Sequence, residues 1–504
     1  MGYFLLFLLF VSILFSIPAV QTKLGGIATK KLNQDFNTRI SIKKVDLSFL
    51  GNVQLEGIEI RDHHQDTLIF VNELKTSIFS FKNSIQNKFN LGNVSLDGVY
   101  VYMKTYQGES RDNMAVFVNS FGNDSQKDSV TSPFTLSSPN MYINNLNYKL
   151  INENAVNPVS FSAKNGGASL QEVFIYGPDF SSKIRGLYFE DNKGLEINNL
   201  STDFKYSKTA MNFKNTILQT RNSEIKATID FSYKIQDLSS FNDKVHINAT
   251  FDNSVLSLPD LKKYYSELEG NDVLYFSGDM NGKLNDFSLD KLRLSSKFGI
   301  GIIGDFNFLN AVNHNRGFTF NADVKTFSAT YFHLRTMLPN VLGTVLPSAS
   351  KKLGKFSMKG TVALDPNKIN ASFDLASQIG HVSSELEIHG FSDEAAPIYD
   401  GKIQLKNFDL GVLLNNPLFG KTSFQVALNG QGFEPNLANT SFNAKVSKLN
   451  FKKYTYKNID LEGLYKNKRL DGSMKIEDEY FKTNLNGFAD LSSSSNKFDF
   501  NTEI

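Results

Sequence analysis

A pair of adjacent histidines is the first feature of this sequence that could do chemistry. His63 and His64 stand between Asp62 and Asp66 in the segment RDHHQD. Imidazole and carboxylate groups are usual zinc ligands, but a site needs three or four of them to converge. Adjacent side chains on an extended chain point apart, and the other ligands would have to come from elsewhere. We therefore expect a solvated turn here and predict no metal site.

The remaining residue types indicate no enzyme chemistry. The chain has no Cys, which excludes disulfides, thiolate zinc sites and thiol nucleophiles. It has no Gly-rich phosphate loop, no Gly-x-Ser-x-Gly segment and no His-Glu-x-x-His segment. The acidic pair Asp478-Glu479 is interpreted as part of a solvated face, because a glycosidase pair cannot be inferred without geometry. We predict no catalytic residue and no cofactor, and the formal net charge of +2 gives no sign of nucleic acid binding.

A repeat points instead to a stacked architecture. The segment GNVQLEGIEI begins at Gly51, GNVSLDGVYV begins at Gly92, and a looser third copy, KNIDLEGLYK, begins at Lys457. Repeats of this kind indicate stacked structural units rather than a single active site.

Each of the first two copies carries a glycine at which the alternation of apolar residues slips by one position. Val53 and Leu55 precede Gly57, and Ile58 and Ile60 follow it. Gly98 separates apolar residues in the same way, with Val94 and Leu96 before it and Val99 and Val101 after it. We expect a β-bulge at each glycine, because a bulge absorbs one extra residue and glycine adopts positive φ without cost. The alternative is a two-residue hairpin turn at Asp97-Gly98, which would leave unusually short arms.

The rest of the chain predicts strand after strand. Runs of alternating apolar and polar residues are separated by Gly, Asn, Asp and Ser at roughly 10–15 residue spacing, typical of about 25–30 strands. Short helices are expected at 258–270, within 331–354 and at 408–417. The 44 Phe and 19 Tyr residues also favour strands over helices.

The N-terminus predicts a membrane anchor. The run from Tyr3 to Val20 carries no charge, and as a helix it would span roughly 27 Å. We assign residues 1–20 to a retained transmembrane helix; cleavage as a signal peptide after Ala19 is the competing interpretation. The following residues, 21–37, predict an amphipathic helix with Leu24, Ala28, Leu32 and Phe36 on one face and Ile27 beside them. That helix would lie at the membrane surface, plug the end of a sheet or pack on a neighbouring strand.

Several segments together resemble the AsmA-like family, and most closely the N-terminal part of its TamB-like chains. They are IPAVQTKLGGIATKKLNQDF, ISIKKVDLSFLGNVQLEGIEIRD, FDLGVLLNNPLFGKTSFQVALNGQGF and YKNIDLEGLYKNKRLDGSMKIEDEYFKTNLNGFADLS. The resemblance touches both ends of the chain, but it rests on a pattern rather than on catalytic residues. Nothing here matches the family's C-terminal domain, and FDFNTEI ends on strand-like residues. We therefore expect a part of a longer chain.

The resemblance implies a fold and a function. The fold is mainly β: a transmembrane helix followed, over residues 38–504, by an elongated twisted sheet curled into a repeating groove with a few short helices. The function is an inner-membrane protein, mostly periplasmic, that carries phospholipids between the inner and outer membranes and supports outer-membrane biogenesis. The resemblance also implies an outer-membrane barrel partner of the Omp85 type. The charge pattern points the other way from this periplasmic location. Lys23, Lys30 and Lys31 follow the predicted helix, and taken alone they would place that side of the membrane in the cytoplasm.

Two other functions stay open from the sequence. One is a scaffold of a translocation and assembly module for outer-membrane or secreted proteins; the other is a secreted β-rich adhesin or carbohydrate enzyme. We take Val53, Leu55, Val94, Leu96, Val99 and Val101 as candidates for the lipid groove, and Gly57 and Gly98 as strand-bend glycines. Periodicity alone does not separate an open groove from a closed sandwich. Val99→Asp would separate them, because it should leave an open groove folded but unfold a closed core.

Overall fold

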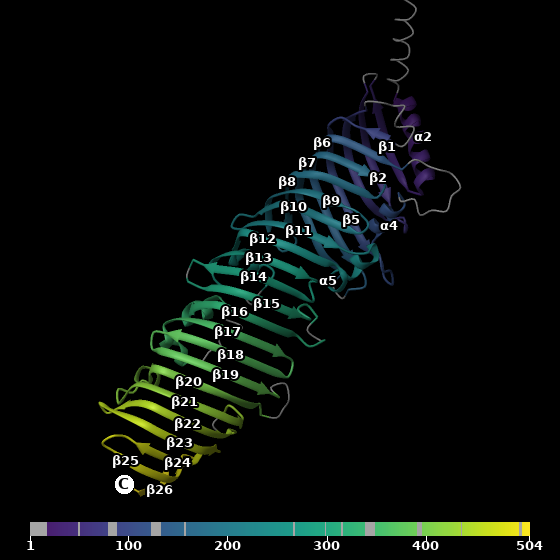
Figure 1. The fold of residues 1–504 in the computed structure, drawn as a ribbon. Helices are drawn as coiled ribbons and strands as arrows, with labels where there is room; N and C mark the ends of the chain where they lie inside the picture. Colours follow the sequence, from purple (N-terminus) through teal and green to yellow (C-terminus); the bar gives the residue numbers. More distant parts are fainter. Residues whose placement is uncertain are drawn as a thin grey trace, which may run out of the picture. The chain divides into compact units, whose positions relative to one another are not determined.

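The protein folds mainly into β-strands, as its computed structural model shows (Figure 1). The structure describes residues 18–48, 51–78, 88–121, 133–155, 158–265, 268–297, 299–313, 316–337, 348–390, 396–434, 436–492 and 496–503. Strands make up 67% and helices 12%, and the sheet is mixed and not closed. The chain divides into two compact units, Met1–Leu256 with Gly282–Leu284, and Ser257–Asn281 with Asn285–Ile504. The prediction of a mainly β protein is confirmed.

The first unit contains the following helices and strands, in chain order: α2 (Pro18–Phe36), β1 (Ile40–Leu47), β2 (Asn52–Arg61), β3 (Thr67–Ser77), β4 (Lys88–Asn90), β5 (Val94–Thr105), α4 (Asn113–Asn119), β6 (Thr135–Asn152), β7 (Val159–Tyr176), β8 (Asp179–Asp191), β9 (Glu196–Tyr206), β10 (Ala210–Gln219), β11 (Glu224–Ser232), η1 (Ile235–Ser240), α5 (Phe241–Lys244) and β12 (His246–Ser257). Strands β1, β2, β3 and β5 pair antiparallel in that order. Strand β6 then lies parallel to both β4 and β5, and antiparallel pairing resumes from β6 to β12. A parallel pair needs a crossover, and the connection from β5 to β6 includes α4.

The second unit contains these elements: α6 (Leu258–Lys262), β13 (Val273–Gly282), β14 (Phe287–Ser296), β15 (Gly301–Leu309), β16 (Thr319–Thr330), α7 (Tyr331–Met337), η3 (Ser348–Leu353), β17 (Lys355–Asp365), β18 (Lys368–Ser377), β19 (Gly380–His389), β20 (Ile398–Asp409), α9 (Leu410–Leu414), β21 (Phe419–Gln431), β22 (Asn439–Phe451), β23 (Tyr454–Lys466), β24 (Arg469–Glu477), β25 (Lys482–Asp490) and β26 (Lys497–Glu503). From β14 to β26 each strand pairs antiparallel with the next one along the chain. The helices of this unit fall within the three segments where the sequence predicted them, and α6 covers only the start of the predicted 258–270 helix.

Helix α2 closes the open edge of strand β1. The side-chain amide of Asn33 donates to the carbonyl of Ile40 at 2.9 Å and accepts from its N–H at 2.8 Å. Phe36 is buried against the rings of Phe121 and Phe134, with centroids 5.0 and 5.9 Å away. Ile27 is 62% exposed and does not pack on the sheet. The sheet edge is thus capped by a side chain that imitates a partner strand.

The predicted anchor falls almost wholly outside the described residues, which begin at Pro18. In the part of the chain that the structure covers, no helix is both long and apolar enough to span a bilayer. The predicted helix 21–37 is present as α2, with slightly different ends.

Gly57 and Gly98 lie inside continuous strands, and both adopt positive φ, at 65° and 64°. The register places Lys43 and Asn72 directly opposite them, with no extra residue on either strand. A Cβ on Gly57 would come within 2.9 Å of the Lys43 Cβ, and one on Gly98 within 2.8 Å of the Asn72 Cβ. The hairpin alternative is excluded and the expectation of a bulge was wrong. Positive φ at the glycine is enough to change which side of the sheet the following residues face. Leu55 and Ile58, three positions apart, therefore lie on the same side and pack into one apolar cluster.

Asparagine adopts the same left-handed conformation elsewhere, with a register shift at Asn145 and Asn407 and none at Asn458. Asn145, Asn407 and Asn458 adopt φ values of 54°, 50° and 51° within β6, β20 and β23. Asparagine tolerates this region better than other residues with a Cβ. The third, looser sequence copy differs in conformation from the first two, because Gly463 does not adopt positive φ and the left-handed residue of that copy is Asn458.

Buried hydroxyls satisfy the backbone where the pairing register shifts. Thr202 donates to the Lys214 carbonyl at 3.0 Å, and Thr422 donates to the Lys448 carbonyl at 2.9 Å. Both threonines are almost fully buried, and each lies beside a register shift. An unpaired buried carbonyl would cost about 1–3 kcal/mol, and the hydroxyl avoids that cost.

Candidate functional site

The register of the second unit aligns apolar side chains into a row that crosses the strands. Row 1 takes one residue from each strand from β14 to β26: Leu289, Phe306, Ala322, Val362, Ala371, Leu386, Gly401, Leu428, Phe442, Gly463, Gly472, Gly487 and Phe500. Every member is apolar or glycine. A surface of this composition runs without interruption across the strands.

A second apolar row lies two residues away on the same face. Row 2 consists of Phe287, Phe308, Phe320, Leu364, Ile369, Ile388, Tyr399, Gly430, Thr440, Tyr465, Leu470, Ala489 and Phe498. Its only side chains with polar atoms are two tyrosines and one threonine. At its start the rings of Phe287, Phe308 and Phe320 contact one another, with centroids 4.8 and 5.1 Å apart. Aromatic contacts of this kind add about 0.5–1.5 kcal/mol to area burial.

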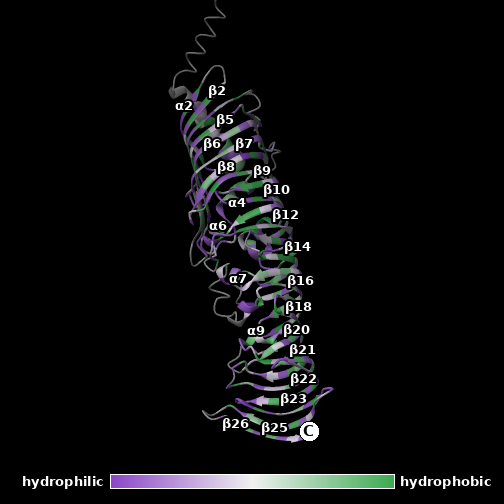
Figure 2. Ribbon diagram, turned by 90° about the vertical axis from the view of Figure 1, so that its left-hand side faces the viewer, coloured by the Kyte–Doolittle hydropathy of each residue, from purple (hydrophilic) through white to green (hydrophobic). Residues whose placement is uncertain are grey.

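The opposite face of the same strands is polar. The row behind row 1 consists of Asp305, Asp323, Thr361, Ser372, Glu385, Lys402, Ala427, Asn443, Glu462, Ser473, Asn486 and Asn501. Figure 2 shows the resulting alternation of hydrophobic and hydrophilic residues along these strands. The Lys325 ammonium, hydrogen-bonded to Asp305, lowers the pKa of that carboxyl group. A hollow in this region is lined by Asp323, Glu385 and Lys402 together with the row 1 residues Ala322, Val362, Ala371, Leu386 and Gly401.

The two faces also differ in exposure. Leu386, Leu428 and Phe442 of row 1 are half-buried, whereas Ala427 and Asn443 on the opposite face are exposed. A half-buried Leu or Phe retains apolar surface in contact with water, and covering it would yield about 25 cal/mol for each Å². The apolar face can therefore take a further apolar layer.

Short helices cover one margin of this face. Leu353 of η3, with Leu410 and Leu413 of α9, packs on a cluster formed by Ile379, Leu405 and Phe408. The Asp409 carboxylate caps α9 by accepting from the Val412 N–H at 3.0 Å. These helices cover the apolar face near the left-handed Asn407. In the described part of the chain, the cluster on which they pack includes no residue of rows 1 and 2.

The sequence-predicted groove residues lie together in the first unit, on one face of β2 and β5. Val53, Val94 and Val99 are 6%, 1% and 5% exposed, so they keep little surface for a ligand. Leu55, Leu96 and Val101 are half-buried and pack on the cluster of Ile58, Val71 and Val99. Rows 1 and 2 lie instead in the second unit, and their residues were not singled out from the sequence. Alternation marked each strand there, but only the register shows that the apolar positions line up.

No protein-family model, no curated protein and no solved structure matches this chain. Its function is therefore argued from its own residues.

Proposed function

We propose that this protein is a membrane-anchored periplasmic bridge that carries phospholipids between the inner and outer membranes, in keeping with the resemblance to the AsmA-like family. In this proposal the strands curl around a groove, and rows 1 and 2 contact the acyl chains. The anchor at residues 1–20 and the location rest on the sequence alone.

One observation carries the proposal. Row 1 offers only apolar residues or glycine on each strand from β14 to β26, and it runs across the strands rather than along them. Neighbouring strands lie about 4.8 Å apart. Because row 2 supplies a side chain wherever row 1 has glycine, an acyl chain moving across the strands would meet an apolar or aromatic side chain on each of them.

The energetic need for such a path is large. Each CH₂ group exposed to water costs about 0.8 kcal/mol, so two acyl chains with ~30 such groups would cost roughly 24 kcal/mol. A continuous apolar surface lowers that barrier without consuming chemical energy. The polar face, with Lys402 and Glu385, keeps the outer side of the same strands solvated.

Photo-crosslinking on adjacent residues tests the proposal, because neighbours on a strand face opposite sides. A benzophenone amino acid would replace Leu428 or Phe442 on the apolar face, and Ala427 or Asn443 on the polar face as controls. The full chain would be irradiated in cells and purified, and its adducts analysed by mass spectrometry.

We expect phospholipid adducts at positions 428 and 442 and few or none at 427 and 443. Equal lipid capture from both faces, or none from the apolar face, would refute the proposal. Capture of polypeptide alone at 428 and 442 would also refute it, and would favour the assembly scaffold.

A further inference from the structure

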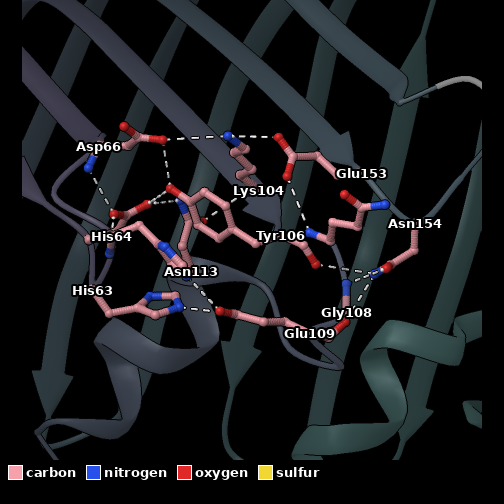
Figure 3. Close-up of polar contacts among 12 residues, drawn as sticks. His63, His64, Asp66, Lys104, Tyr106, Gly108, Glu109, Asn113, Glu153 and Asn154 are labelled. Carbon is pink, nitrogen blue, oxygen red and sulfur yellow. Dashed lines mark hydrogen bonds and ion pairs between the residues drawn. The ribbon is translucent and has the colours of Figure 1, made fainter.

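Three chain segments that are distant in sequence meet at one end of the strands of the first unit (Figure 3). They are the turn between β2 and β3, the segment that follows β5, and the turn between β6 and β7. The Gly108 N–H donates to the Asn154 side chain at 2.8 Å, and the amide of Asn154 donates to the Glu109 carbonyl at 3.0 Å. These hydrogen bonds fix the segment that carries Glu109.

The first turn is held by a buried carboxylate. Asp62 is only 3% exposed, and it accepts hydrogen bonds from the Tyr106 hydroxyl at 2.6 Å and the Asn113 amide at 2.8 Å. It also accepts from the backbone N–H groups of His64 and Asp66, at 2.9 and 3.0 Å. Because four donors meet one carboxylate, the backbone that carries the histidines is rigid.

The two histidines point to the same place. The His63 Nε2 lies 2.9 Å from one carboxylate oxygen of Glu109, and the His64 Nε2 lies 2.6 Å from the other. The expectation that adjacent histidines point apart was wrong. It holds for an extended strand, whereas His63 and His64 occupy a turn, where successive side chains can converge. The His64 ring is further fixed by stacking on Tyr106, at 3.8 Å between centroids.

We propose that His63, His64 and Glu109 form a binding site for a divalent transition metal of the zinc class. The ligand atoms of the three residues already lie within 4.8 Å of one another. Zinc binds imidazole nitrogen at about 2.0–2.1 Å and carboxylate oxygen at about 2.0–2.2 Å, so small side-chain rotations bring all three onto one ion. The ion takes the place of the N–H protons that the imidazoles now share with Glu109, and each ring coordinates in its neutral form, protonated at Nδ1.

The donor set decides the class of metal. Two imidazoles and one carboxylate suit zinc, cobalt, nickel or copper, whereas magnesium and calcium prefer oxygen ligands alone. The side chains of His63, His64 and Glu109 are 29%, 44% and 32% exposed, so water completes the coordination. A bound ion ties the turn after β2 to the segment after β5, and the site acts as a clamp between these two connections.

Metal titration of the full chain, without a polyhistidine tag, tests the site. Co²⁺ is added first, because tetrahedral cobalt absorbs visible light, and the affinity for Zn²⁺ is then measured by calorimetry. The variants are His64→Ala and Glu109→Gln. The control is His389→Ala, because His389 pairs with Glu387 and belongs to no group of three metal ligands among the residues that the structure describes.

We expect one Zn²⁺ per chain, binding at least tenfold weaker in His64→Ala and Glu109→Gln, and unchanged binding in His389→Ala. Zn²⁺ should also raise the melting temperature of the native chain but not that of Glu109→Gln. Circular dichroism and melting in a chelator establish that Glu109→Gln is folded. Unchanged zinc affinity in a folded Glu109→Gln, equal binding of Mg²⁺, or no binding by the native chain would overturn the proposal.

Discussion

Strands at the start of the first unit and strands late in the second unit carry the same alternation of apolar and polar residues, yet they use it differently. Around Val99 the apolar side chains pack against one another, and Ile58, Val71 and Val99 at the centre are almost fully buried. Around Leu428 they form rows that are only half-buried. The alternation assigns a residue to a face, but the neighbours supplied by the register decide whether that face becomes a core or a surface.

Glycine marks the same difference. Glycines occupy row 1 on three successive strands, at Gly463, Gly472 and Gly487, where the first unit has Ile58, Val71 and Val99 side by side. A Cβ on Gly487 would lie 2.0 Å from the Asp499 carbonyl oxygen, so the neighbouring strand leaves no room for a side chain. In the first unit, aliphatic side chains fill the space above these strands. In the second unit, the strands approach so closely at the three glycines that no side chain fits there.

The largest expected effect comes from placing a carboxylate in each region. Val99→Asp should destabilise the first unit by about 4 kcal/mol or more, because a charge enters a packed apolar cluster. Leu428→Asp should cost about 1 kcal/mol, because its side chain still reaches water, while lipid crosslinking at position 442 falls. Urea-dependent proteolysis of the full chain measures both losses. Equal losses in the two variants would remove the distinction between core and surface.

A smaller effect is expected where strands turn over by positive φ. Gly57→Val should destabilise by about 1–3 kcal/mol, because a β-branched residue is strained at φ 65° and its Cβ meets Lys43. Asn407→Gly should be close to neutral, because glycine adopts the same conformation freely. The two can be compared by thermal melting; a neutral Gly57→Val would show that the strand does not need the left-handed residue.

The smallest effect concerns a buried carboxylate that each unit places after a strand. Asp62 accepts from Tyr106, and Asp478, 2% exposed, accepts from Tyr454. The Tyr454 hydroxyl holds the pKa of Asp478 below its usual value, and the carboxylate in turn raises the pKa of Tyr454 to about 12. A lowered carboxyl pKa stabilises the fold above the unfolded pKa of about 3.9, and that contribution is lost as the pH falls through the folded value.

Tyr454→Phe should therefore raise the pKa of Asp478 and reduce stability above pH ~4, with little change at lower pH. Carbon-detected NMR titration of the Asp478 carboxyl group gives the shift directly. An unchanged pKa would mean that the backbone N–H groups of Lys457 and Tyr480 hold the carboxylate without the phenol.

Much of the fold could be predicted from local sequence, whereas what depends on distant partners could not. The strands, their two faces and the special role of Gly57 and Gly98 follow from residues within one strand. The positive φ of Asn458 could not be predicted, because asparagine also occurs in turns. In the third copy the glycine that matches Gly57 is Gly463, so nothing in the sequence favoured Asn458. The meeting of His63 and His64 with Glu109 joins residues 46 and 45 positions apart, through the antiparallel pairing of β3 with β5, which no local pattern specifies.

Row 1 also has a consequence for how such chains change length in evolution. Each strand contributes one position to the row, so duplication of a hairpin adds two positions, or about 10 Å of path, and leaves the others in phase. Loss of a single strand would reverse the direction of every later strand, whereas loss of a pair would not. Proteins built this way can therefore lengthen or shorten such a row by gaining or losing whole hairpins.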